Sequence, residues 1–259
     1  MNILDTIIAN KIKEVTTSKA AVPERELQQF LSFRRPCLSL KQNLLRENST
    51  GIIAEFKRKS PSKGFINQYA NAEKITKEYS NHGASGLSVL TDAPFFGGSA
   101  EDLIAARVND IPILRKDFVI DAYQLTEAKA WGADVILLIA ACLSKKEVKD
   151  LAGFAHQLGM EVLLELHEAD ELGHICNDID LVGINNRNLK TFEVDIQQSI
   201  LLSKAIPAGK LKVAESGITH PATIAEFRSA GYKGFLIGEH FMKEKDPGIA
   251  FQDFVRKLQ

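Results

Sequence analysis

The chain of 259 residues contains few cysteines and almost no excess of charge of either sign. Its three cysteines, Cys37, Cys142 and Cys176, are odd in number and far apart. This argues against a disulfide framework or a cysteine metal site, and it fits a reducing cytosol. Lysine and arginine number 32 against 33 aspartates and glutamates, so no overall field favours nucleic acid or an anionic membrane. Any attraction for an anionic ligand must therefore be local.

The chain also lacks the long apolar runs that a membrane span requires, since none reaches roughly 18 residues. The first residues, MNILDTIIANKIKEV, carry charges throughout and no small-residue cleavage site, so we expect no signal peptide. Apolar residues make up 45% of the chain and charged residues 25%, as in ordinary globular proteins with a substantial core. We therefore expect a cytoplasmic protein with no nucleic-acid or membrane partner.

Short β-branched or leucine-rich runs recur eight times along the chain, with helical patterns between them. The runs are apolar on both faces, as a parallel sheet covered by helices requires. Several helical patterns end on a glycine suited to a helix C-cap, namely Gly83, Gly132, Gly159 and Gly231. The eight runs are 52-IIAEFK, 87-LSVLTD, 112-PILRKD, 135-VILLIAA, 161-EVLLEL, 181-LVGINNR, 212-KVAESG and 234-GFLIGE.

Eight βα units predict an α/β fold, the (β/α)8 TIM barrel. The alternative is an open doubly wound sheet, which is disfavoured because no G-x-G-x-x-G follows the first run. We take residues 1–259 as a single barrel domain, of which residues 1–50 are an N-terminal helical extension. Within it, 38-LSLKQNLL predicts one short helix. Apolar residues at helical spacing predict an earlier amphipathic helix: Ile3, Leu4, Ile7, Ile8, Ile12 and Val15.

Ionic and amide residues end five of the runs, at the face where this fold places its active sites. Three of these residues, Lys116, Glu165 and Glu215, follow an apolar residue by two positions. Residues two positions apart share one face of a strand, so we expect each charged side chain to point into the barrel together with its apolar neighbour. The apolar neighbours are Leu114, Leu163 and Val213. So many buried charges are tolerated only if they form ion pairs. Their close approach also shifts their pKa values, and acid–base catalysis makes use of such shifts. A buried ion-pair network without chemistry is the alternative. The residues are Glu55, Lys57, Lys116, Glu165, Asn185, Glu215 and Ser216.

A phosphate site is predicted beside these residues. Ser216 and Gly217 follow the seventh run, and Gly238 and Glu239 follow the eighth. Loops after the seventh and eighth strands, with a short helix N-terminus, form the recurrent phosphate site of this fold. Glycine lets backbone N–H groups approach the phosphate oxygens closely.

Histidines and the remaining aromatic residues support no further site. We take His167 as a loop residue rather than a base, and the other five histidines show no ligand spacing. Phe95 and Phe96 precede two glycines, and they fit a mobile apolar wall or a core contact equally well.

Taken in order, the motifs resemble the indole-3-glycerol-phosphate synthase family across nearly the whole chain. They are IIAEFKRKSPSKG, LTDAPFFGGS, LRKDFVID, LLELH, GINNRNL, VAESGI and FLIGEHFM. The resemblance implies a carboxy-lyase that closes the indole ring of 1-(2-carboxyphenylamino)-1-deoxyribulose 5-phosphate in tryptophan biosynthesis, with loss of carbon dioxide and water. It implies a small phosphorylated anilino-sugar as substrate and no metal or organic cofactor. The sequence does not determine the oligomeric state.

The resemblance also implies catalytic roles. Lys116 matches the general acid at the substrate's keto oxygen, and a lysine acts as an acid near pH 7 more readily once burial and neighbours lower its pKa. Glu165 matches the acidic partner that stabilises iminium charge or takes up a proton. Glu55 and Lys57 match the pair for dehydration, and Glu215 matches the carboxylate that orients the ribulose chain.

Further positions match substrate contacts in the family. Ser60 and Asn185 match contacts around the anthranilate carboxylate and the sugar hydroxyls. Glu239 is a departure, because some members carry serine there; a side chain that points away would leave a backbone contact intact. The other matches are the apolar walls Phe118 and Leu137, the rim charge Arg187, the further contact Leu236, and Ser216, Gly217, Gly238 and Glu239 around the phosphate.

Two rival functions stay open. A sibling phosphate-binding barrel such as phosphoribosylanthranilate isomerase would place a cysteine or aspartate acid–base pair at strand ends, and no cysteine lies at the first strand. A barrel that only binds a phosphate ligand would keep the glycines, but it would not need Lys116 and Glu165 together.

Overall fold

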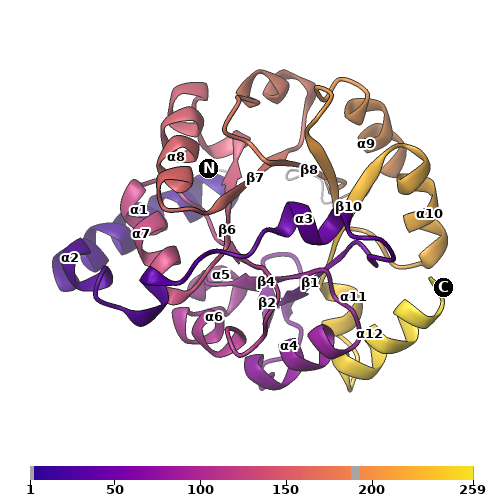
Figure 1. The fold of residues 1–259 in the computed structure, drawn as a ribbon, viewed down its shortest axis with the longest axis horizontal. Coiled ribbons are helices and arrows are strands. Elements are labelled where there is room, and N and C mark those ends of the chain that lie inside the picture. The colour runs from indigo at the N-terminus through magenta and orange to yellow at the C-terminus, as the bar shows by residue number, and fades with distance from the viewer. Residues whose placement is uncertain (1–2, 188–192, 259) are drawn as a thin grey trace.

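The computed structural model describes residues 3–187 and 193–258, and its central feature is a closed barrel of eight parallel strands (Figure 1). Strand β1 pairs with both β4 and β10, which closes the barrel. Every predicted run forms one of these strands, so the TIM-barrel prediction is confirmed. The strands are β1 (Ile52–Phe56), β4 (Gly86–Leu90), β5 (Ile113–Lys116), β6 (Val135–Ile139), β7 (Glu161–Leu166), β8 (Leu181–Asn185), β9 (Leu211–Glu215) and β10 (Tyr232–Ile237).

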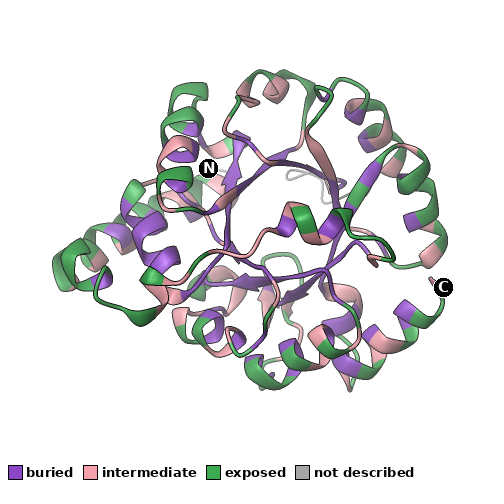
Figure 2. Cartoon of the chain, viewed as in Figure 1, coloured by how far each residue is buried: buried purple, intermediate pink, exposed green. Residues whose placement is uncertain are grey.

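Helices surround the barrel, and their exposed faces point to solvent while the strands are buried (Figure 2). The connection from β7 to β8 contains only the 3-10 helix η3 (Ala169–His174), and a small hairpin, β2 (Lys59–Ser60) with β3 (Gly64–Phe65), follows β1. The sequence predicted neither element. The other elements are α4 (Ala72–Asn81), α5 (Ala93–Phe96), α6 (Ala100–Ala106), α7 (Ala122–Trp131), η2 (Ala140–Cys142), α8 (Lys145–Gln157), α9 (Ile196–Ser203), α10 (Pro221–Ser229), α11 (Glu239–Met242) and α12 (Pro247–Arg256).

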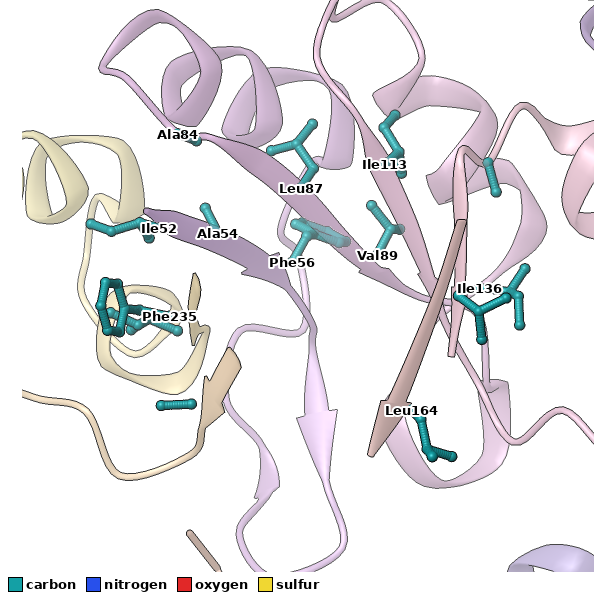
Figure 3. Close-up of a cluster of buried hydrophobic side chains, with 14 of the residues drawn as sticks. Ile52, Ala54, Phe56, Ala84, Leu87, Val89, Ile113, Ile136, Leu164 and Phe235 are labelled. Atoms are coloured by element: carbon teal, nitrogen blue, oxygen red, sulfur yellow. The ribbon is translucent and has the colours of Figure 1, made fainter. Parts of the chain in front are cut away.

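The core has two layers because the strands are apolar on both faces. Outward-facing residues such as Phe56, Val89 and Leu164 pack between the barrel and the helices (Figure 3). Inside the barrel, a separate cluster contains Leu114, Leu163 and Val213. These three are the residues that alternation placed on the inner face, so that prediction is confirmed.

The segment before β1 forms α1 (Ile3–Ala21), α2 (Glu24–Leu27), η1 (Leu31–Arg34) and α3 (Leu40–Leu45). Helix α3 lies across one opening of the barrel (Figure 1), where Leu40 and Leu44 join the interior cluster. A Cβ at Gly86 would lie 2.6 Å from Leu40 Cδ1, so the absence of a side chain there admits the helix. Both predicted helices are confirmed.

The buried face of helix α1 differs from the predicted one. Ile12 is 54% exposed, so its assignment to the apolar face is wrong, whereas Lys11 is fully buried. The Lys11 ammonium lies 2.8 Å from Asp117 Oδ1, 3.2 Å from Asp92 Oδ2 and 2.9 Å from Glu14 Oε1. Asp92 and Asp117 follow β4 and β5, so this lysine attaches the N-terminal helix to the end of the barrel where the strands terminate.

We expect Lys11→Met to lower the free energy of unfolding by about 3–5 kcal/mol, because it leaves buried Asp92 and Asp117 without their shared cation. Urea melts would measure this. Lys19→Met is the matched control: it removes an ion pair of the same helix with Asp121, but both side chains are partly exposed, so its expected cost is below about 1 kcal/mol. Equal midpoints for the two variants would contradict the structural role of Lys11.

Across residues 3–187 and 193–258, no helix combines the length and apolar character needed to cross a membrane.

Candidate active site

A cavity of about 260 Å³ lies at the C-terminal ends of the barrel strands. Every residue that the sequence singled out as catalytic or substrate-binding lines it, including those from β1, β5, β7, β8, β9 and β10. The N-terminal helix closes one side through Ile3, Leu4 and Ile7, which the sequence did not assign to the site. The structure therefore brings the predicted residues together, and their individual roles stay predictions.

The floor of the cavity is a cluster of charges centred on Lys116. Its ammonium lies 2.9 Å from Glu165 Oε2 and 3.7 Å from Glu215 Oε2. Asn185 Nδ2 donates a hydrogen bond of 3.0 Å to the other oxygen of Glu165. The lysine comes from β5 and the carboxylates from β7 and β9, so the closed barrel sets these distances. Both carboxylates are buried, and such groups are tolerated only when paired.

The pKa of Lys116 is raised above its ordinary value in this setting. Burial alone would lower it, but the carboxylates of Glu165, Glu215 and Glu55 outweigh burial. The expectation of a lowered pKa is therefore wrong. Lys116 is a protonated ammonium, and it can donate a proton but cannot accept one.

The two floor carboxylates have pKa values displaced in opposite directions. Burial alone would raise the pKa of Glu165, yet Lys116, His167 and Asn185 hold it well below its usual range. Burial raises the pKa of Glu215, and the neighbouring Glu165 carboxylate adds to that rise while Lys116 opposes it. Adjacent carboxyls in unlike environments are a recurrent means of obtaining a base and an acid in one site.

Two glycines make room for these carboxylates. A Cβ at Gly183 would collide with Glu215 Oε1. A Cβ at Gly238 would lie 2.5 Å from Glu55 Oε1 and 2.8 Å from Glu55 Cβ. The sequence assigned Gly238 to a phosphate alone, whereas the structure shows that the packing of Glu55 also requires it.

Glu55 and Lys57 lie side by side on β1 and just beyond it, with 2.8 Å between Glu55 Oε1 and Lys57 Nζ. Side chains two positions apart share a face of a strand, which brings both into the cavity. Ser60 lies in the hairpin beyond them, and its buried hydroxyl has no hydrogen-bond partner among the described residues. An unpaired buried hydroxyl facing a cavity is suited to a polar group of a ligand.

The loops after β9 and β10 meet at one side of the cavity. Ser216 and Gly217 both have positive φ, at 68° and 71°. Such a conformation is strained for serine, and strained residues cluster at functional sites. Helix α11 begins at Glu239, directly after Gly238, so its first N–H groups have no partner within the helix. These features fit the predicted phosphate site.

Two cations contact the Glu239 side chain, whose direction the sequence left open. Its carboxylate lies 2.6 Å from Lys63 Nζ and 3.7 Å from Arg187 Nη2. Burial alone would raise the pKa of Glu239, but Lys63, Lys57 and Arg187 lower it. An anionic side chain therefore lies among the cations at the rim.

Apolar side chains form the remaining walls. The rings of Phe118 and Phe96 lie 6.1 Å apart, and both line the cavity with Leu137 and Leu236. Phe96 is therefore a wall residue, while Phe95 does not line the cavity.

Sequence reasoning missed His167, which lines the cavity and lies 3.1 Å from Glu165 through Nε2 and Oε1. The signal was present, because Leu163, Glu165 and His167 alternate along one face of β7 and its extension. Thr219 and Lys243 were also missed. Within the described ranges, no group of three or more histidine, cysteine, aspartate or glutamate side chains could hold a metal ion.

The chain is similar to known proteins over nearly all of its length. A family model described as indole-3-glycerol phosphate synthase matches residues 4–254. An indole-3-glycerol phosphate synthase of Bacteroides thetaiotaomicron is 50% identical over 259 residues, covering 100% of this chain and 99% of the relative. One of Laribacter hongkongensis is 44% identical over 255 residues, covering 96% of this chain and 97% of the relative.

Solved structures share the barrel at low sequence identity. A 3-hexulose-6-phosphate synthase superimposes with a TM-score of 0.65 at 13% identity, over 81% of this chain and 100% of that chain. A chain of the tryptophan synthase complex from Pyrococcus furiosus gives a TM-score of 0.60 at 15% identity, over 80% of this chain and 97% of that chain. These likenesses concern the fold alone.

Proposed function

The chain belongs to the indole-3-glycerol phosphate synthase family, and on this premise we propose that Lys116 is the acid that starts its reaction. The enzyme is a carboxy-lyase of tryptophan biosynthesis. It converts 1-(2-carboxyphenylamino)-1-deoxyribulose 5-phosphate to indole-3-glycerol phosphate and releases carbon dioxide and water. The observation that supports the proposal is the Lys116 ammonium, held 2.9 Å from Glu165 and 3.7 Å from Glu215 on the cavity floor.

The substrate carries two anionic ends, and the cavity offers a place for each. The phosphate would lie against the loops of Ser216–Gly217 and Gly238–Glu239, where backbone N–H groups and the start of α11 meet. The anthranilate carboxylate would lie toward the unpaired hydroxyl of Ser60, with Arg187 at the rim. The aromatic ring would pack between Phe118 and Leu137. The ribulose chain then crosses the floor, above Lys116.

Ring closure needs an acid at the keto oxygen. The ring carbon that bears the carboxylate attacks the keto carbon, and the new C–C bond forms as the carbonyl π electrons move to oxygen. Lys116 gives its proton to that oxygen, which becomes a hydroxyl. Positive charge develops on the anilino nitrogen, and the Glu165 carboxylate stabilises it. A carboxylate with a lowered pKa stays ionised for this purpose.

Loss of carbon dioxide returns the C–C bonding electrons to the ring and neutralises the iminium charge. The hydroxyl then leaves as water, which needs a proton donor at oxygen and an acceptor for the ring proton. We assign this step to the ion pair of Glu55 and Lys57, because β1 lies across the barrel from β7, which carries Glu165. The raised pKa of Glu215 favours its protonated form, and in that form it can donate a hydrogen bond to a ribulose hydroxyl.

A turnover assay tests this function. We expect the purified chain to convert the anilino-ribulose phosphate to a product with indole fluorescence, with one carbon dioxide released for each indole formed. Sulfate or inorganic phosphate should compete with the substrate and raise KM, because the predicted phosphate site binds any tetrahedral dianion.

The rival functions give different results in the same experiments. Isomerisation of phosphoribosylanthranilate would indicate the sibling barrel. Tight binding of the anilino-sugar with no indole formed would indicate a barrel that only binds. Unchanged KM at high sulfate would contradict the assignment of the phosphate end.

We also place the enzyme in the cytoplasm, as a single barrel domain with residues 1–50 as its helical extension. The three cysteines are free thiols, which supports a reducing compartment.

A further inference from the structure

His167 is a buried titratable residue of the cavity to which the reaction above assigns no step. Its side chain is 7% exposed and follows Glu165 by two positions. Neither ring nitrogen forms a hydrogen bond of good geometry with any residue in the described part of the chain. Burying a polar group without a hydrogen bond costs free energy, and such groups persist where function requires them.

The imidazole lies between two carboxylates. Nε2 is 3.1 Å from Glu165 Oε1, and Nδ1 is 3.9 Å from Glu171 Oε2 in η3. The same Glu171 oxygen accepts a hydrogen bond of 2.5 Å from the His167 backbone N–H, which fixes the base of the side chain. Acidic and basic groups thus alternate from the loop to the floor, in the order Glu171, His167, Glu165 and Lys116.

The Glu165 carboxylate can rotate about its last bond, and each of its oxygens has different partners. Oε2 contacts Lys116, whereas Oε1 accepts the hydrogen bond of Asn185 and contacts His167. Two groups on Oε1 oppose rotation of the carboxylate. A catalytic group misplaced by about 1 Å can lose on the order of 10²-fold in rate, so this restraint has a kinetic consequence.

We propose that His167 is a positioning residue that holds Glu165 Oε1, so that Oε2 stays on Lys116 while the ring closes. The inference rests on the proposed function, because it acts through Glu165 and requires no contact with the substrate. Its protonated form suits this position best, since an imidazolium facing two carboxylates is attracted to both.

The charges around the ring support that form. Burial alone would lower the pKa of His167, and Lys116 across Glu165 also lowers it, but Glu165 and Glu171 raise it above its ordinary value overall. Burial raises the pKa of the Cys142 thiol, in η2, to about 12, and the charges of the same two carboxylates add to this rise. The thiol is therefore neutral and adds no charge.

Removing His167 also removes one of the groups that lower the pKa of Glu165. The pKa of that carboxyl then rises, so the variant loses its ionised Glu165 at a higher pH than wild type. The acid limb of the kcat profile should move to higher pH by at least about half a unit. A residue that only fills space would not move this limb.

The test compares His167→Ala and His167→Gln with His156→Ala. We expect His167→Ala to lower kcat roughly 10–100-fold with KM within about threefold, and His167→Gln to recover part of the loss because its amide N–H can reach Oε1. His156→Ala is the matched control, since His156 pairs with Asp180 at 2.8 Å outside the cavity. It should leave kcat and the pH profile unchanged.

A double-mutant cycle locates the effect. If His167 acts through Glu165, His167→Ala changes kcat by less than about twofold in a Glu165→Gln background. An equally large loss in that background overturns the proposal, as does a kcat and pH profile of His167→Ala that match wild type. If His167→Ala does not fold, the pH profile of kcat is measured on His167→Gln instead, and its acid limb should lie at higher pH than that of wild type.

Failure of the inference differs from failure of the proposed function. If Glu165→Gln alone keeps full activity, the catalytic role of Glu165 and the positioning role of His167 are both overturned, whereas the acid role of Lys116 is tested by its own variant. If Glu165→Gln is inactive while His167→Ala and His167→Gln behave as wild type, only the positioning role of His167 is overturned.

Discussion

Lys116→Met should lose at least 10²–10⁴-fold in kcat, and the variant should remain folded. Methionine has a similar length but no proton to donate to the keto oxygen. KM should change little, because the predicted phosphate and carboxylate contacts lie on other strands. Steady-state turnover of the anilino-ribulose phosphate, followed by indole fluorescence, measures both constants.

The fold should survive because the carboxyls that face Lys116 can share a proton. Without the ammonium, Glu165 and Glu215 form a pair of buried carboxyls, and repulsion between such groups raises one pKa until that group is neutral. Binding of indole-3-glycerol phosphate to Lys116→Met, measured by calorimetry, would show an intact cavity. Lys146→Met, on the surface of α8, is the control for a generic loss of lysine and should have wild-type kinetics.

Turnover of Lys116→Met within a few-fold of wild type would exclude Lys116 as the acid. The pH dependence offers an independent check. Because the pKa of Lys116 is raised, it stays protonated well above neutrality, so its deprotonation should not limit the wild-type rate between pH 7 and 9.

The barrel could be predicted from the sequence because each strand has a local signature. Parallel strands buried on both faces read as short continuous apolar runs, and all eight runs were of this kind. The inward direction of Glu165 and Glu215 followed from Leu163 and Val213, two positions earlier, since side-chain alternation is local as well. The same rule applied to His167 would have placed it in the cavity.

What the sequence did not predict depends on contacts between distant parts of the chain. Lys11 interrupts the apolar face of α1, and periodicity alone assigns a lysine to solvent. Its burial results from Asp92 and Asp117, which lie about 80 and 106 positions later and meet it only in the folded barrel. The fit of Gly238 to Glu55 is likewise a contact between the first and last barrel strands.

The direction in which the pKa of Lys116 shifts could not be predicted from the sequence for a related reason. Burial lowers the pKa of a lysine and nearby carboxylates raise it, so the outcome depends on distances. At 2.9 Å from Glu165 and 3.7 Å from Glu215, the carboxylates prevail.

The second large effect is expected for Glu165→Gln, which should lose roughly 10²–10⁴-fold in kcat. Glutamine keeps the shape and one oxygen of the carboxylate, but it cannot take up a proton or stabilise the iminium charge as an anion. We expect Glu55→Gln to lose most activity as well, through the dehydration step. Turnover assays and urea melts on the same samples measure activity and the free energy of unfolding together.

The stability of Glu165→Gln separates a working site from a structural ion cluster. A purely structural pair that loses one partner costs about 3–5 kcal/mol, because a buried charge is left alone. Here a second carboxyl is available. The Glu165 carboxylate adds to the rise in the pKa of Glu215, and without that charge this pKa falls, which favours an ionised Glu215 at 3.7 Å from Lys116. We therefore expect a change below about 1.5 kcal/mol at pH 7.5.

The pH dependence of that change has a definite sign. Glu165 has a lowered pKa in the folded protein, so its contribution to stability is present above its unfolded pKa and is lost as the pH falls through the folded value. Glu215 has a raised pKa, so its burial costs stability above its unfolded value, and this cost grows with pH up to the folded value. Glu165→Gln relieves the second, so its unfolding free energy should fall less than that of wild type as the pH rises from 4 to 8, and the loss of the first contribution should change the pH dependence only below the unfolded value of 4.5. A melting midpoint that drops by the equivalent of 3 kcal/mol or more, with activity retained in the folded fraction, would instead identify these charges as structural.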